Sequence, residues 1–251
     1  MITPTGMTVK EYCEAIDNGV THIRMTFPVE NIVLTDDDFE SNGIQINDYM
    51  NSEEDLTFGM ASSQEITAFF FKSNKTEALE WVNEFQLELG VEYQDSISWI
   101  TVGYFTGKKP TKTDIDVITF TAYDRMVKFD VIADDLLQSL DYTQGLTLQD
   151  IYDELCSYVG ITNVTGDEIN ANMNINFTSA PFFAEGITCR QILKWIAEAA
   201  GCYARILNTG EVKLVWFQHH VNDFLLKRDD CYEIDISERS EEYTSELQSR
   251  I

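Results

Sequence analysis

One short stretch carries oxygen ligands at the spacing of a calcium-binding loop. Asp38, Glu40 and Asn42 occupy alternate positions and Gly43 follows at the sixth, as in an EF-hand loop. The twelfth position is Tyr49 instead of the bidentate glutamate, and no helices are expected on either side. The alternative interpretation is an Asn-Gly hairpin turn between two strands. The three oxygen-bearing residues are therefore calcium candidates only, and the sequence indicates no cofactor.

The three histidines offer few bases for nucleophilic chemistry. His22 falls in a predicted strand, while His219 and His220 follow the end of another. A serine or cysteine nucleophile needs a base within hydrogen-bond reach, but no G-x-S-x-G elbow occurs. Glycine-rich phosphate loops and zinc-binding spacings are also missing, and the many carboxylates single out no acid–base pair. We therefore predict that the chain is not an enzyme and has no catalytic residues.

A basic cluster interrupts the chain at the tip of a predicted hairpin. Lys108, Lys109 and Lys112 lie within five positions, in the sequence KKPTK. One interpretation is a solvated loop. The other is a docking loop for an acidic neighbour, such as another copy of the chain, because opposite charges favour association.

The charge balance of the 251 residues excludes several classes of partner. There are 17 Lys and Arg against 43 Asp and Glu, a formal net charge of −26. Tight binding to nucleic acid needs clustered cations, and an anionic membrane surface needs them too. No apolar run is long enough for a membrane span, and the N-terminus does not resemble a secretory signal. Five cysteines without a C-x-x-C pair indicate reduced thiols and folding in a cytoplasm.

The first half of the chain alternates with a period of two, which is typical of half-buried strands. A short helix at 8–19 is expected first, because Thr8 and Glu11 form a capping box. Antiparallel strands follow from about 20 to 72, and the clearest hairpin spans 96–130. Between them, residues 75–89 show helical spacing and are predicted to form a helix that ends at Gly90.

The second half changes to helical spacing. Helices are predicted at 134–141, 147–159 and 188–200, followed by a hairpin at 203–217. The expected fold class is α+β and β-rich: an antiparallel β-barrel-like domain at 1–130, then a smaller α+β unit at 131–238.

Two stretches resemble a known family. One is the hairpin with Gly103-Tyr104-Phe105 and residues 118–126, and the other runs from 188–204 to 210–214. The opening strands at 32–38 and 56–61 fit as well. In this order and spacing, they resemble the baseplate hub and tail-associated (Tal-like) proteins of tailed phages and prophages of Gram-positive bacteria.

The resemblance implies a virion structural protein of the tail tip, assembled in the host cytoplasm. Such hubs are homotrimers whose β-barrel-like domains form a ring that closes the tail tube, and their neighbours are a distal tail protein, tail tube or tape-measure protein. The first alternative is the non-catalytic N-terminal region of a tail-associated peptidoglycan hydrolase. The second is an acidic carbohydrate-binding β module, for which exposed Trp99 or Trp216 would supply the stacking surface.

The last residues have a separate interpretation. Residues 239–251 resemble the translation of a sequencing adapter, although they also read as an amphipathic helix end. We expect this segment to be non-native and the native polypeptide to continue differently beyond about residue 238. Without it the net charge would be −25, because it contains two Arg and three Glu.

Overall fold

The computed structural model describes residues 21–49, 59–93, 96–112, 116–164, 171–179 and 185–216. The chain divides into two compact units, Met1–Phe217 and Gln218–Ile251, and every described residue belongs to the first. None of the helices in these ranges has both the length and the apolar character needed to cross a bilayer.

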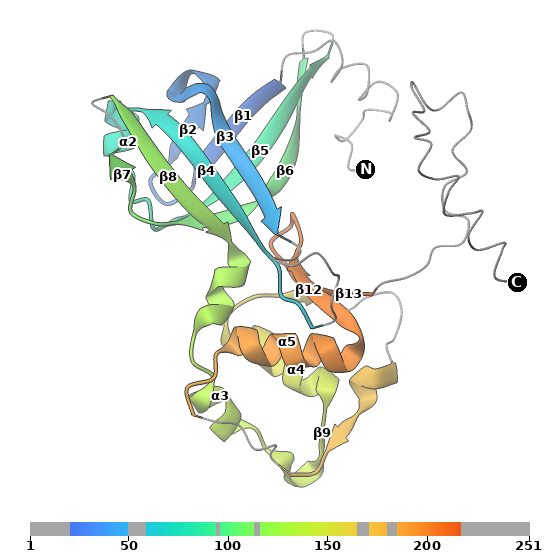
Figure 1. Cartoon of the computed structure of the whole chain (residues 1–251). Helices are drawn as coiled ribbons and strands as arrows, with labels where there is room; N and C mark the ends of the chain where they lie inside the picture. The colour runs from blue at the N-terminus through green and yellow to red at the C-terminus, as the bar shows by residue number, and fades with distance from the viewer. Residues whose placement is uncertain are drawn as a thin grey trace, which may run out of the picture. The chain divides into compact units, whose positions relative to one another are not determined.

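The first half is a nearly closed, antiparallel, barrel-like sheet (Figure 1). Its strand order is β2-β1-β5-β6-β8-β4-β3, and the short strand β7 pairs with β8. The strands are β1 Thr21–Phe27, β2 Ile32–Thr35, β3 Phe39–Tyr49, β4 Ser63–Phe71, β5 Glu84–Tyr93, β6 Ser96–Gly107, β7 Thr111–Lys112 and β8 Val117–Asp124. A 3₁₀ helix, η1 (Asp36–Asp38), joins β2 to β3, and the one-turn helix α2 (Asn74–Glu77) lies between β4 and β5.

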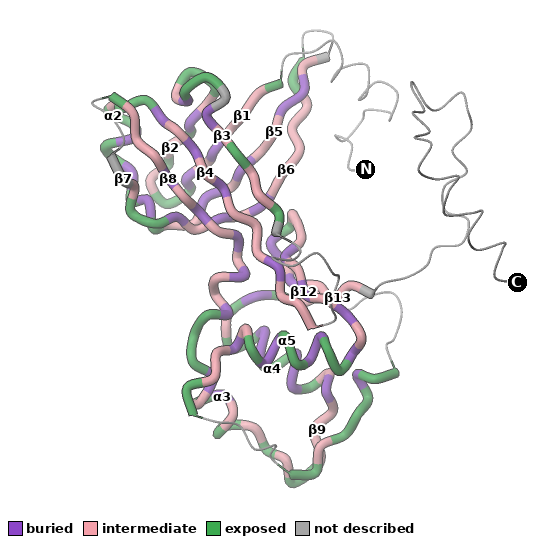
Figure 2. The backbone as a smooth tube through the Cα atoms, viewed as in Figure 1, coloured by how far each residue is buried: buried purple, intermediate pink, exposed green. Residues whose placement is uncertain are grey.

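Alternation along the strands directs aromatic side chains into one core. Figure 2 shows buried and partly exposed residues alternating along the strands, as a period of two requires. The fully buried aromatic residues of this core are Phe27, Phe70, Phe85, Phe105 and Phe120. Trp81 closes the cluster, with its ring centroid 4.6 Å from that of Phe120. Gly107 leaves the necessary space, because a Cβ there would lie 2.1 Å from Phe120 Cζ and 2.4 Å from the Trp81 carbonyl oxygen.

The second half is built from helices and short strands around its own core (Figure 1). Its elements are η2 Arg125–Asp130, α3 Asp134–Ser139, η3 Tyr142–Gln144, β9 Leu146–Thr147, α4 Leu148–Tyr158, β10 Asn163–Val164, η4 Ala171–Asn174, β11 Asn176–Phe177, α5 Cys189–Ala200, β12 Cys202–Ile206 and β13 Val212–Trp216. Strands β12 and β13 form an antiparallel hairpin, and β10 adds to β13 in parallel.

The helix ends follow the local sequence. Thr147 caps α4 in a capping box with Asp150, and the Thr188 hydroxyl accepts from the Gln191 amide at the start of α5. Gly201 ends α5 in the left-handed region with φ of 69°, which glycine adopts without steric cost. The helices predicted at 134–141, 147–159 and 188–200 and the hairpin at 203–217 are confirmed, with ends shifted by one or two residues.

Two local predictions are wrong. Residues 75–89 do not form one helix: α2 is a single turn, and the segment from Glu84 is strand β5. Phe85, Leu87 and Val91 are buried at a period of two, because β5 pairs with β1 on one side and β6 on the other. The second error is the Asn-Gly hairpin turn. Gly43 lies inside β3, where the pairing with β4 shifts register between Phe39 and Ile44, as in a β-bulge.

The α+β, β-rich fold class with a barrel-like sheet is confirmed. The domain boundaries at 130 and 238 stay predictions. The helix expected at 8–19, the strand residues Leu56 and Phe58, and the segment 239–251 lie outside the described residues.

Candidate functional site

Three connections meet where β1, β4 and β6 end. They are the turn at 28–31, the loop at 78–83 and the loop that begins at Lys108. The first two are joined by a 2.6 Å hydrogen bond from Asn83 Nδ2 to Glu30 Oε1. The third is adjacent to the second, because Gly107 packs against the Trp81 carbonyl. We call this region the barrel-end surface.

The barrel-end surface combines exposed apolar side chains with lysines. Val29 is 73% exposed, Val82 60% and Phe71 44%. Lys108 and Lys109 are exposed in the third connection, and the Lys108 ammonium lies 4.7 Å from the centroid of the Tyr123 ring. Val29 and Val82 lie in the two connections that the Asn83–Glu30 hydrogen bond joins, and grouped apolar exposure is typical of interaction sites.

The predicted docking loop is part of this surface. Neither Lys108 nor Lys109 forms an ion pair within the described part of the chain, whereas Lys72 and Lys75 pair with Glu77 and Asp38. The backbone of Lys112 lies in β7, and its side chain is outside the description. The docking role of these lysines stays a prediction that no contact in the structure tests.

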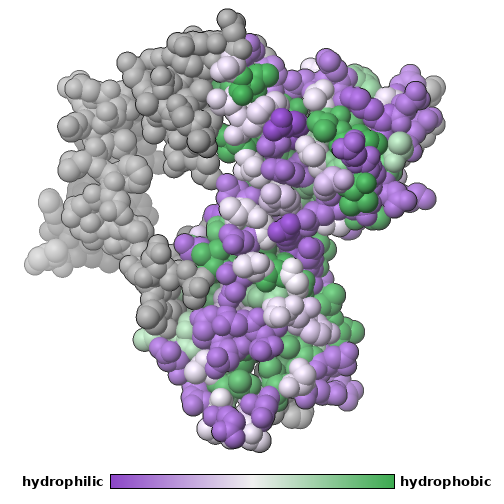
Figure 3. Space-filling view, turned by 180° about the vertical axis from the view of Figure 1, so that it is seen from behind, coloured by the Kyte–Doolittle hydropathy of each residue, from purple (hydrophilic) through white to green (hydrophobic). Residues whose placement is uncertain are grey.

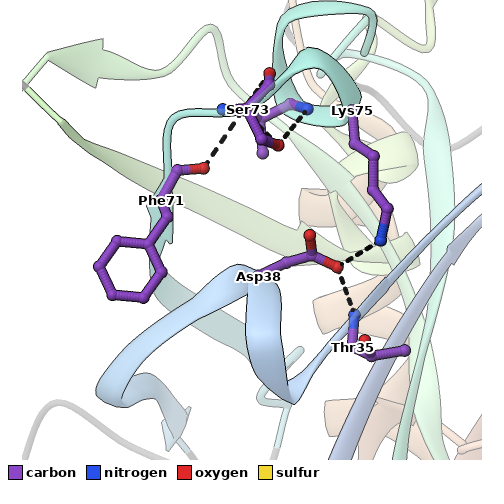
Figure 4. A network of polar contacts seen from close by, with 6 residues as sticks. Thr35, Asp38, Phe71, Ser73 and Lys75 are labelled. Atoms are coloured by element: carbon purple, nitrogen blue, oxygen red, sulfur yellow. Dashed lines mark hydrogen bonds and ion pairs between the residues drawn. The ribbon is translucent and has the colours of Figure 1, made fainter.

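The calcium candidates occupy different surroundings. Asp38 belongs to η1, and its Oδ2 accepts from the Thr35 amide at 2.9 Å and from Lys75 Nζ at 2.8 Å (Figure 4). Glu40 is exposed in β3, and the Asn42 side chain lies outside the description. In the ranges that the structure describes, no three His, Cys, Asp or Glu side chains are grouped to hold a metal ion. Asp38 thus serves as the third residue of a capping box that begins at Thr35, and as the ion-pair partner of Lys75.

A second polar centre joins the two halves of the protein. Arg125 donates from Nε and Nη2 to the two carboxylate oxygens of Glu84 at 2.9 and 2.6 Å. Its Nη1 donates to the Gly210 carbonyl at 3.2 Å, and the guanidinium lies 4.5 Å from the centroid of the Tyr104 ring. The hydrogen bond to Arg125 holds the pKa of Glu84 below its ordinary value. Arg125 thereby links the barrel, through its bidentate pair with Glu84, to the turn between β12 and β13, through the Gly210 carbonyl.

The buried carboxylate next to it is structural. Asp124 accepts from the Ser63 hydroxyl at 2.8 Å, the Gln64 amide at 3.0 Å and the Met126 amide at 3.1 Å. Burial raises the pKa of Asp124, while these three donors act in the opposite direction. Its role is to cap η2 at the point where the chain leaves the barrel.

His22 is placed as a cation. Its Nδ1 lies 2.6 Å from Asp36 Oδ2 and its Nε2 lies 3.2 Å from Glu92 Oε2. Both ring nitrogens can donate only in the imidazolium form. The hydrogen bond to Asp36, followed by that to Glu92, raises the pKa of His22. Such a residue suits ion pairing better than general base catalysis, and His219 and His220 lie outside the described residues.

Trp99 and Trp216, the aromatic residues proposed for carbohydrate stacking, do not form a binding face within the described part of the chain. The guanidinium carbon of Arg24 lies 4.1 Å from the centroid of the Trp99 ring and covers one face of it. Arg24 is itself held by Glu88 at 2.6 Å. The Trp216 side chain is outside the description. No observation here therefore favours the carbohydrate-binding alternative.

The described cysteines are buried in the core of the second half. Cys156, Cys189 and Cys202 form no disulfide, as predicted for reduced cysteines. Burial raises the pKa of Cys156 to about 12 and that of Cys189 to about 11. Such thiols are poor nucleophiles, and their role is to fill the second core.

Comparisons with known proteins give a structural similarity only. No protein-family model matches the sequence, and no curated protein matches it significantly. Among solved structures, the 43 kDa tail protein of prophage MuSo2 from Shewanella oneidensis is 16% identical with a TM-score of 0.39, over 77% of this chain and 52% of that chain. A tail protein from Neisseria meningitidis MC58 is 11% identical with a TM-score of 0.49, over 77% and 50%.

Both structural neighbours are named as tail proteins, the first of them from a prophage, and this chain spans about half the length of each. Identities this low, with TM-scores below 0.5, establish neither a family nor a function for this chain. The Gram-positive host and the hub assignment stay predictions.

Proposed function

We propose that this chain is a structural, non-enzymatic component of a phage tail tip or baseplate, which assembles as a homotrimeric hub ring at the end of the tail tube. Its neighbours in that assembly are a distal tail protein, the tail tube or the tape-measure protein. The sequence resemblance and the barrel-like sheet followed by an α+β part support this role.

One observation carries the proposal. The stretches that resemble the hub family are far apart in the sequence, yet residues from three of their pieces meet at a single point. Tyr104 and Arg125 come from the hairpin pieces, and Gly210 comes from the piece after α5. Motifs that determine one shared contact are more informative than isolated turns, because they specify how the two halves join.

Immunogold electron microscopy of phage particles tests the location. Antibodies against the purified chain should label the tail tip of particles from the parent phage or induced prophage. Label confined to the capsid, or particles without label although the chain is expressed, contradicts the proposal. Light scattering on the full-length polypeptide then tests the trimer, and a stable monomer contradicts the ring.

A further inference from the structure

Negative charge is distributed very unevenly along this chain. Residues 129–189 contain no Lys, Arg or His. Ten carboxylates lie in the same stretch: Asp130, Asp134, Asp135, Asp141, Asp150, Asp153, Glu154, Asp167, Glu168 and Glu185. A surface built from such a stretch has no cations of its own to neutralise it, apart from those that other elements supply.

Helix α4 presents part of this stretch as one exposed face. Asp150, Asp153, Glu154 and Tyr158 are all exposed, and their spacing of three and four places them on the same side of the helix. The Tyr158 side chain is 44% exposed, so an apolar ring lies among the carboxylates. We call these four residues the α4 acidic face. Within the described part of the chain, none of its carboxylates forms an ion pair with Lys, Arg or His.

The barrel-end surface has the complementary chemistry. It offers Lys108 and Lys109, which form no ion pair with a carboxylate in the described ranges, and the exposed Val29 and Val82 of the other two connections. In Figure 3, seen from behind, hydrophobic residues reach the surface of the protein among hydrophilic ones. A surface that carries cations and exposed valines is complementary to one that carries carboxylates and an exposed tyrosine ring, because interfaces combine polar and apolar contacts.

We propose that the barrel-end surface of one copy docks on the α4 acidic face of a second copy. Two copies that each carry a net charge of −26 repel at long range, and a contact that joins opposite charges offsets this repulsion. The two surfaces differ, so the contact is head-to-tail, and head-to-tail contacts close into rings when the rotation permits. This inference rests on the proposed ring assembly and names the surfaces that would form it.

Charge reversal in the full 251-residue chain tests the contact. One variant carries Lys108→Glu and Lys109→Glu, and a second carries Asp153→Lys and Glu154→Lys. Asp150 is kept because it caps α4 through Thr147. The matched control for the first variant carries Lys194→Glu and Lys213→Glu, which make the same change of charge on α5 and β13. Sedimentation velocity in 50 mM salt measures self-association, and circular dichroism verifies that each variant is folded.

We expect the wild type and the control to self-associate, and each test variant alone to bind itself at least tenfold more weakly. Mixing the two test variants should restore association. The positions changed by Lys108→Glu and Lys109→Glu in the first variant then face those changed by Asp153→Lys and Glu154→Lys in the second, so opposite charges meet again. Unchanged self-association of the Lys108/Lys109 variant overturns the inference, and so does a mixture that stays dissociated. If the wild type forms trimers that neither charge reversal weakens, this inference is wrong but the proposed function stands. If the antibodies fail to label tails in electron microscopy, the proposed function itself is contradicted.

Discussion

Arg125 should couple the two halves of the protein energetically. Replacing it by alanine removes the bidentate pair with Glu84, the bond to the Gly210 carbonyl and the contact with the Tyr104 ring. The side chains of Arg125 and Glu84 are 24% and 30% exposed, between the surface and buried limits. Exposed pairs contribute about 0.2–1 kcal/mol, and breaking a buried pair costs about 3–5 kcal/mol. We expect Arg125→Ala to lower the free energy of unfolding by about 2 kcal/mol at pH 7.

The pH dependence of that loss has a defined sign. The folded pKa of Glu84 is below its ordinary value, so its contribution is present above the ordinary pKa and is lost as the pH falls through the folded pKa. Urea unfolding of the wild type and Arg125→Ala at pH 7 and pH 3.5 measures the difference. The gap should shrink at the lower pH. A loss under about 0.5 kcal/mol at pH 7, or a gap that is the same at both values, refutes this account.

Gly210 supplies a matched double-mutant cycle for the same contact. Its φ is 84°, and a Cβ there would lie 2.2 Å from Arg125 Nη1 and 3.0 Å from Tyr104 Cδ2. Gly210→Ala should therefore cost more in the wild type than in the Arg125→Ala background, where only the backbone strain of about 1–2 kcal/mol and the tyrosine contact remain. Additive costs would mean that the two positions do not interact.

Three further predictions concern single residues. The wild type should lose at most about 1 kcal/mol of stability as the pH rises from 6 to 9, and His22→Gln should abolish this loss. The reason is that the folded pKa of His22 is raised, so its contribution to stability is present below about pH 6.5 and is lost as the pH rises through the folded pKa. Thermal unfolding at each pH measures the difference. Gly107→Ala should destabilise by more than about 2 kcal/mol, whereas Gly103→Ala, whose Cβ would meet its nearest side chain at 3.1 Å, should cost less in urea unfolding. Cys156 should resist a thiol reagent at pH 8 until the protein unfolds, because its pKa is about 12; rapid modification of the folded chain, read by mass spectrometry, contradicts this.

The sequence predicted those parts of the fold whose signals are local. The threonine caps of α4 and α5, the left-handed Gly201 and the alternation in β4 each act within a few residues, and they form the helices and strands predicted there. Local signals do not decide the segment at 75–89, because its apolar spacing fits both a helix and a strand over a short window. Pairing with β1 and β6 decides it, and strand pairing is a long-range interaction.

The candidate site is less accessible to sequence reasoning. Lys108 and Lys109 were visible as a cluster, but Val29 and Val82 are ordinary loop residues in the sequence. They share a surface because a hydrogen bond joins Glu30 to Asn83, 53 residues apart. Likewise, Arg125 and Gly210 lie 85 residues apart. The sequence gives one weak indication of this contact, because Arg125 and Gly210 both belong to pieces that resemble the same family.

Salt should separate the two consequences of the net charge of −26. Within one copy, like charges repel, and screening of that repulsion should raise the midpoint of thermal unfolding between 50 and 500 mM salt. Between copies, the proposed contact joins opposite charges, so the same change should weaken self-association. A stability and an association that both increase with salt would mean that the copies meet through apolar surface alone. The opposite responses are expected because Lys108 and Lys109 are placed to meet carboxylates that have no ion-pair partner within the described part of their own chain.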